Sequence, residues 1–306
     1  MSLLTLRAAA ARTDAAELPI AEPRSLFAHC GNPRCDTGWM QLWRNSRRPL
    51  FAGRWACSPR CMEQMVSAAL SRESADASPL RPRLPMPTGL ILVEHGDISA
   101  EQLQAALRER AQSVAEGGQS VTLGEWLVTS GVVRESVLTR ALGMQWSCPV
   151  FSLSGYRPDG LGPALPQLLG ESLAALPVSA APGKLLYLAF AGCVDRSLSY
   201  AVERMLGVRV VPGVAGDGEF RRAQARFRAE PAPPARLLEA AGAGSLARSL
   251  ARIVEREKPA DARLVRVHNT WWLRLWKHAG PVPGTPDFRD VEDILCVAGA
   301  APAPAG

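Results

Sequence analysis

The sequence lacks the features that mark a membrane-spanning protein or a common enzyme. Its longest apolar run, at 185–194, is about half of the ~20 residues that a helix needs to cross a bilayer. It contains no Gly-x-x-x-x-Gly-Lys-Ser/Thr phosphate loop, because its sole Gly-Lys pair, Gly183-Lys184, is followed by leucine. No Ser-His-Asp order, His-Glu-x-x-His motif or acid pair stands out either. We therefore expect a protein that is not an enzyme and does not insert into a membrane.

Targeting signals and strong charge are also missing. Arg7 and Arg12 interrupt the apolar character of the first 20 residues, so this segment does not resemble a signal peptide. The net charge is +6, and nearly all of the positively charged side chains are arginine. This charge permits weak binding to nucleic acid or acidic lipid without requiring it. The seven cysteines are an odd number and four of them form two close pairs, a pattern that favours metal over disulfides. We expect a soluble protein in the reducing cytoplasm.

Proline-, serine- and glycine-rich stretches divide the chain into compact units. A length of 306 residues suffices for two or three small domains. The expected fold class is an α/β (α+β) multidomain protein with a small zinc finger, a helical repeat joined to an α/β sandwich, and a small C-terminal α+β unit. The expected segments are a disordered leader at 1–24, the finger at 25–72, a linker at 73–86, a central domain at 87–228 (helical repeats at 88–146, α/β part at 151–228), a linker at 229–236, the α+β unit at 237–298 and a tail at 299–306.

The cysteine-rich block predicts a metal centre. Cys30 and Cys35 are separated by four residues, Cys57 and Cys61 by three, and 21 residues lie between the two pairs. Two such turns can supply the four thiolates of a closed tetrahedral zinc site. The block resembles treble-clef zinc fingers, although a first gap of two residues is commoner there. We predict one structural zinc per chain, followed by a helix whose apolar side contains Met62, Met65, Val66 and Leu70.

Two alternatives to this ligand set remain. The four cysteines could be reduced and buried without metal, although a segment of 48 residues with few aliphatic side chains would hardly fold unaided. His29 could also replace Cys30 as a ligand. The remaining cysteines are isolated in apolar surroundings, so Cys148, Cys193 and Cys296 are expected to be core residues.

The finger also carries features of a nucleic-acid-binding module. Seven arginines against two acids between 25 and 72 give +5, and the −2 of a zinc held by four thiolates lowers this to about +3. Trp39, Trp43 and Trp55 interleave with the arginines and could stack on bases. They could equally form the core of the finger, so nucleic-acid binding is an alternative to a protein-docking or purely structural role.

The region that follows contains two copies of one pattern, TGLILVEHGDISAEQLQAAL and, 35 residues later, LGEWLVTSGVVRESVLTRAL. Each copy predicts a helix, a glycine stop and a second helix. Gly96 and Gly131 suit the left-handed conformation that follows a helix end. Ser99 and Gln102 predict a capping box for the next helix, whereas the second copy has Arg134 at the cap position. These signals predict a four-helix repeat.

The pattern LGxxLVxxG…LxxAL, followed by GMQWSCPVFSLSGY, resembles the N-terminal domain of bacterial type II secretion and type IV pilus assembly ATPases. The segments after it predict the order strand, strand, helix, strand, helix, as in that family, so the resemblance covers about 87–228. It implies a docking domain whose partner is a protein of the secretion or pilus machinery. Because no phosphate loop is present, the leading hypothesis is an adaptor or regulator that keeps the docking domain without the motor.

Some members of that family bind cyclic di-GMP through a motif that opens with Arg-Leu-Gly and closes with Gln. In this chain the opening arginine positions hold Pro87 and Thr122, and the closing positions hold Arg110 and Gln145. Without those arginines, charge-assisted contacts to the phosphates are lost, unless Arg110 or the arginines at 81 and 83 compensate. A helical scaffold is therefore favoured, with a cyclic di-GMP sensor as an alternative. The candidate nucleotide-binding residues that remain are Gly89, Gly124 and Gln145.

The C-terminal unit predicts an amphipathic helix and a β-hairpin that turns at 268–270. It is similar to the start of the second N-terminal module of the same ATPases, but only Asp261 matches well, because Arg263 and Val265 stand where that family has His and Glu. His268 is expected in the turn and His278 in a loop. The tryptophans could be hairpin core or a partner surface: Trp271, Trp272 and Trp276.

Overall fold

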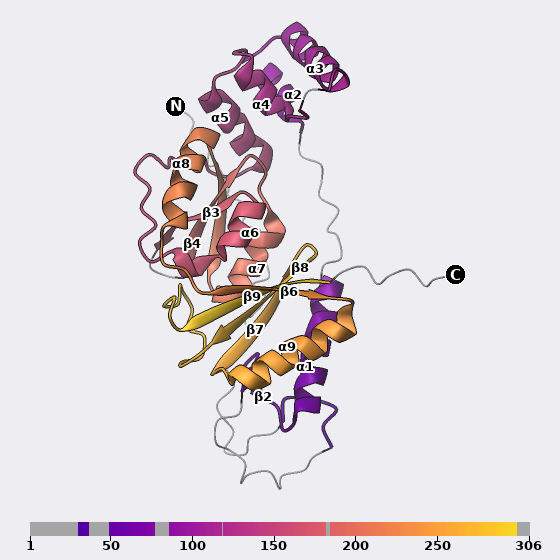
Figure 1. The fold of residues 1–306 in the computed structure, drawn as a ribbon. Helices are drawn as coiled ribbons and strands as arrows, with labels where there is room; N and C mark the ends of the chain where they lie inside the picture. Colours follow the sequence, from indigo (N-terminus) through magenta and orange to yellow (C-terminus); the bar gives the residue numbers. More distant parts are fainter. Residues whose placement is uncertain (1–29, 37–48, 77–85, 118, 182–183, 299–306) are drawn as a thin grey trace, which may run out of the picture.

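In the part of the chain that the structure describes, the fold is a mixed α/β arrangement with three small sheets (Figure 1). The computed structural model of the chain describes residues 30–36, 49–76, 86–117, 119–181 and 184–298. The leader, the tail and most of the first linker that the sequence predicts lie outside these ranges. None of the helices in the described part is long and apolar enough to cross a bilayer.

The sequence repeat forms a small helical bundle, at the top of Figure 1. Its helices are α2 (Thr88–Glu94), α3 (Ala100–Ala115), α4 (Leu123–Thr129) and α5 (Glu135–Trp146). Gly96 and Gly131 have φ values of +73° and +75°, so both predicted left-handed stops are confirmed. The capping box of Ser99 with Gln102 is also present, and Arg134 makes no side-chain cap. The bundle has a hydrophobic cluster of its own.

The α/β part follows the predicted order of strands and helices. Its elements are η2 (Gly162–Ala164), α6 (Gln167–Ser172), β3 (Ala175–Ala181), β4 (Leu185–Ala191), α7 (Arg196–Leu206), β5 (Arg209–Ala215) and α8 (Asp217–Arg228). The sheet order is β3-β4-β5, antiparallel for the first pair and parallel for the second. Helix α7 makes the crossover between the parallel strands. It begins with the side chain of Asp195, which accepts a hydrogen bond from Leu198 N, and ends at Gly207 with φ +63°.

The C-terminal unit is a four-stranded sheet with one long helix. Its elements are β6 (Ala235–Ala240), α9 (Ala243–Glu257), β7 (Asp261–Val267), β8 (Thr270–Trp276) and β9 (Val291–Ala298), and the strand order is β6-β9-β8-β7. The β7–β8 hairpin turns at His268, whose φ is +52°, as predicted. Asp293 pairs with the fully buried Arg274 across the sheet.

The two faces of this sheet are covered by different parts of the chain. Trp272 and Trp276 belong to the hydrophobic cluster of the α/β part, whereas Trp271 belongs to a cluster shared with α9 and the cysteine block. All three tryptophans are buried. They are therefore core residues of the hairpin and do not form an exposed partner surface.

The cysteine block packs onto the C-terminal unit. It contains β1 (Leu50–Phe51), β2 (Arg54–Trp55) and α1 (Pro59–Asp76). Helix α1 lies beside α9 (Figure 1), and its predicted apolar side is buried. It runs four residues past the predicted end of the finger at 72. The segments 25–72 and 237–298, expected from the sequence as separate units, share one hydrophobic cluster in the described residues.

Candidate metal centre

The first cysteine pair lies in a tight turn held by backbone hydrogen bonds. Cys35 N donates to Asn32 O at 3.0 Å, and Gly31 N donates to Trp55 O at 2.8 Å, which joins the turn to β2. A Cβ atom on Gly31 would lie 2.4 Å from Cβ of Arg54 and 2.9 Å from Cε of Met65. Only glycine fits there, so the turn approaches the hairpin and α1 closely.

The second cysteine pair lies at the start of α1. Ser58 precedes the helix, and its Oγ accepts a hydrogen bond from Cys61 N at 3.2 Å, the usual role of an N-cap serine. Pro59 occupies the first helical position, where its missing N–H costs nothing. Cys61 therefore lies in the first turn of α1.

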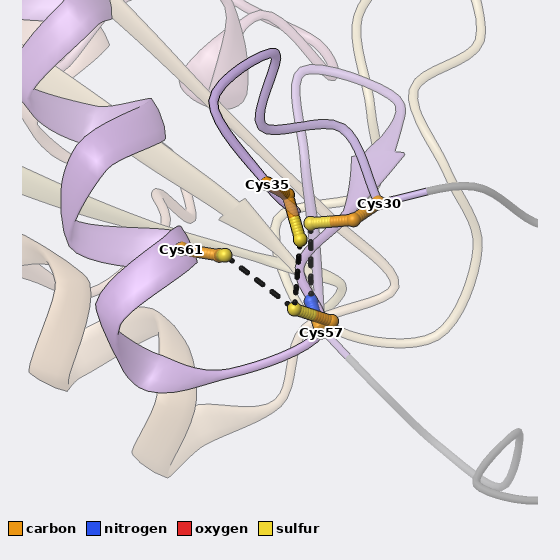
Figure 2. Close-up of side chains that lie close together, drawn as sticks. All are labelled: Cys30, Cys35, Cys57 and Cys61. Atoms are coloured by element: carbon orange, nitrogen blue, oxygen red, sulfur yellow. Dashed lines mark hydrogen bonds between the residues drawn. The ribbon is translucent and has the colours of Figure 1, made fainter. Parts of the chain in front are cut away.

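The four predicted ligands converge on one point (Figure 2). Their sulfur atoms all lie within 4.8 Å of one another, and Sγ of Cys57 is 3.4 Å from Sγ of both Cys35 and Cys61. Four sulfurs around one zinc are about 3.8 Å apart, for Zn–S bonds of about 2.3 Å. The cluster fits a single tetrahedral ion of this size.

Hydrogen-bond donors also point at the sulfurs. Cys57 N donates to Sγ of Cys30 at 3.4 Å, and Nδ2 of the buried Asn32 lies 3.3 Å from Sγ of Cys61. Such N–H groups stabilise negative charge on sulfur and orient the ligands. No disulfide joins the four cysteines. The donor set is therefore four sulfurs that form no disulfide, and N–H groups point at those of Cys30 and Cys61.

Burial affects the pKa of one thiol of the cluster, that of Cys30. Cys57 and Cys61 are each 7% exposed, and burial raises the pKa of the Cys30 thiol to about 12. A cation stabilises the thiolate form and opposes this effect. His29, the alternative ligand to Cys30, lies outside the described residues.

The other cysteines do not join this cluster. Cys296 is fully buried, as predicted, and Cys148 is half-buried. Cys193 is exposed, so its prediction as a core residue was wrong. The chain leaves β4 at Gly192, with φ +93°, and Val194 occupies the core position. The side chain of Cys193 is left on the surface.

The candidate nucleotide-binding glycines lie under leucine side chains. A Cβ atom on Gly89 would lie 2.8 Å from Cδ1 of Leu103, and one on Gly124 would lie 3.0 Å from Cδ2 of Leu138. Within each repeat, the second helix thus packs closely against the glycine of the first, and a larger side chain there would displace a leucine. Close packing is a structural role for both glycines.

The motif-closing residues are engaged within the chain. Gln145 Nε2 donates to Met86 O at 2.9 Å, and its Oε1 accepts from Thr88 Oγ1 at 2.9 Å. Arg110 Nε donates to Val121 O at 2.7 Å. Each side chain therefore holds the segment that leads into one repeat. The structure gives these side chains a scaffold role that the sequence analysis did not predict.

The charge balance of the cysteine block is less positive when the whole of α1 is counted. The last turn of α1 adds Glu73 and Asp76, so seven arginines face four acids over 25–76, a balance of +3. Four thiolates on one zinc lower this to about +1. Trp55 packs against the core cluster, and Trp39 and Trp43 lie outside the described residues. The charge argument for nucleic-acid binding is correspondingly weaker.

Comparison with known proteins finds a structural likeness over part of the chain. No protein-family model and no curated protein matches the chain. A structure of MshE with cdg is similar at 26% identity, over 46% of this chain and 98% of that chain, with a TM-score of 0.38. Two crystal forms of the N-terminal domain of XpsE are similar at 17% and 18% identity, over 45% and 44% of this chain and 92% and 90% of theirs, with TM-scores of 0.32 and 0.27. The chain matches MshE and the N-terminal domain of XpsE over somewhat less than half of its length.

Proposed function

We propose that this protein is a non-catalytic adaptor or regulator, related to the docking domain of type II secretion and type IV pilus ATPases and stabilised by a structural zinc. The observation that carries the proposal is the convergence of four cysteine sulfurs inside a hydrophobic cluster. A site closed by four sulfurs leaves no position for substrate. The ATPase-like repeat is the second support, because it predicts a docking module in a sequence without a phosphate loop.

The proposed zinc would be held by Cys30, Cys35, Cys57 and Cys61. When bound, it would supply structural cross-linking and no reaction chemistry. Residues around the site position the ligands. Ser58 fixes the start of α1, and the close approach at Gly31 holds the first cysteine turn against Arg54 and Met65.

Elemental analysis of the purified full chain tests the metal. We expect about one zinc per chain, because four thiolates form one closed site. Cys57→Ser should lose the zinc and expose the cysteine block to protease, since metal binding supplies folding free energy. Cys148→Ser is the matched control, because this cysteine lies outside the cluster, and it should keep the zinc. A metal-free protein that tolerates chelator without local unfolding would refute the site.

Capture of partners from the native cell tests the adaptor role. We expect the full chain to retain a protein of the secretion or pilus machinery. Leu90 on α2 is 52% exposed, so Leu90→Asp should reduce capture if the docking-like module makes the contact. Leu237→Asp is the control, because Leu237 is 69% exposed on the C-terminal sheet. Equal capture by both variants and the wild type would show that Leu90 of the bundle does not contribute to partner binding.

A further inference from the structure

We infer that the four-cysteine centre supports the C-terminal sheet and the C-terminal end of helix α7, so that loss of the metal loosens both as well as the cysteine block. The inference rests on the proposed metal centre. Its starting point is the contact between the β1–β2 turn and β7, two segments 208 residues apart in the sequence. The sequence had placed these segments in separate units, so it did not predict this contact.

The first link joins the hairpin of the cysteine block to the edge of the C-terminal sheet. The turn between β1 and β2 is formed by Ala52 and Gly53, with φ values of +53° and +72°, as in two-residue hairpin turns. Ala52 N donates to Ala262 O at 2.7 Å, and Gly53 N donates to Oδ1 of Asp261 at 2.9 Å. The turn that precedes Cys57 is thus bonded directly to β7.

The second link is the packing of α1 against α9. Met62 and Val66 of α1 and Leu246 and Leu250 of α9 are all fully buried. They share one hydrophobic cluster with Cys57, Cys61 and the face of the sheet that contains Trp271. Because α1 begins at the second cysteine pair, the position of its first turn depends on the cluster of sulfurs.

The third link holds the C-terminal end of α7. Glu73 of α1 is buried and lies 2.5 Å from Nη2 of Arg204 in α7. Arg263 of β7 donates to the carbonyl of Met205 at 3.2 Å, and Gly284 N donates to Leu206 O at 3.1 Å. Carbonyls at a helix end need such donors. These groups come from the cysteine block and the C-terminal unit.

The N-terminal end of α7 is held in the same way. Nε2 of His268, in the β7–β8 turn, lies 2.5 Å from Oδ2 of Asp195, the residue that caps α7. Between the two ends, Trp272 and Trp276 of β8 lie in one cluster with Leu198 and Met205. The sheet is therefore attached to α7 along its length, while its opposite face depends on α1 and α9.

Removing the metal should act through this chain of contacts. Without the ion, the two cysteine turns and the first turn of α1 lose their cross-link. Helix α9, which covers one face of the sheet, then loses its packing against α1. Helix α7, on the other face, loses the Glu73–Arg204 ion pair. The α2–α5 bundle has a separate cluster, so it should not respond.

Hydrogen exchange of the metal-loaded full chain, before and after a zinc chelator, tests the inference. Amides of β7, α9 and the last turn of α7 should exchange about tenfold faster or more after stripping, because local opening sets exchange rates. Amides of α3 and α5 should keep their rates. If stripping accelerates exchange in 30–76 alone, the inference is wrong and the metal centre stands. A chain that carries no metal overturns both.

Two variants separate the links. Cys57→Ser should reproduce the effect of the chelator, and Cys148→Ser should not; where Cys57→Ser fails to fold, chelation of the wild type decides. Glu73→Gln leaves the cysteines intact, so it should keep the metal and accelerate exchange only near Arg204. An unchanged α7 in Glu73→Gln would refute the part of the inference that runs through this ion pair.

Discussion

At the scale of single residues, the buried carboxyl of Asp261 joins the cysteine block to the C-terminal sheet. It is 3% exposed, and its Oδ1 accepts hydrogen bonds from Gly53 N and Ala262 N. Burial raises the pKa of its carboxyl, and the two N–H bonds and Arg263 oppose the shift. Because the folded pKa is raised, the contribution of Asp261 to stability is full below the ordinary aspartate pKa and is lost as pH rises through the raised value.

Substitutions at Asp261 separate its charge from its hydrogen bonds. Asp261→Asn keeps an acceptor oxygen without a buried charge, so at pH 7 its stability should lie within about 1 kcal/mol of the wild type. The pH dependence that Asp261 contributes should vanish. Asp261→Ala removes the acceptor and should cost about 1–3 kcal/mol. Denaturant unfolding of metal-loaded protein at several pH values measures both. Equal damage by the two substitutions would mean that the charge, and not the hydrogen bonds, stabilises this contact.

Single residues also show which features of the structure could be predicted from the sequence. The four cysteine positions were predictable because each pair forms a local turn, and two such turns suffice for one ion. Arg274 and Asp293 were not, because nothing local indicates that an arginine in β8 pairs with an aspartate beyond the following loop. Cys193 was mispredicted since apolar neighbours do not determine which way a turn residue points.

At the scale of elements, the repeat specified its helices and their ends. Glycine stops and the Ser99 cap depend on residues within one turn, so they can be read from a sequence. The capping box of Thr122 with Glu125 carries the same Ser/Thr-x-x-Glu/Gln signal and could have been found. The packing of α1 on α9 could not, because it joins distant segments through apolar faces that would fit many partners.

The two repeats offer a matched test of capping. Ser99 accepts from Gln102 N at 3.1 Å, whereas Arg134 at the start of α5 makes no side-chain cap. Ser99→Ala should therefore destabilise the bundle by about 1 kcal/mol, and Arg134→Ala should change its stability little. Hydrogen exchange of α3 and α5 in the two variants measures the difference. A larger effect for Arg134→Ala would contradict the assignment of the caps.

For the whole molecule, the arrangement places the α/β part and the cysteine centre on opposite sides of the C-terminal sheet (Figure 1). The sheet contacts both, so the three units predicted from the sequence are linked through it. The arrangement also leaves the helical bundle as the part with the most independent core.

Cyclic di-GMP binding is the property that distinguishes an adaptor from a sensor at this scale. We expect no heat when cyclic di-GMP is titrated into micromolar full chain by calorimetry. The ligand carries two phosphates, and Pro87 and Thr122 at the arginine positions offer no cation to pair with them. Gln145 would also have to give up its bonds to Met86 and Thr88, which adds a cost to binding. Measurable heat that Gln145→Ala abolishes would contradict this expectation and would make the paired repeats a sensor.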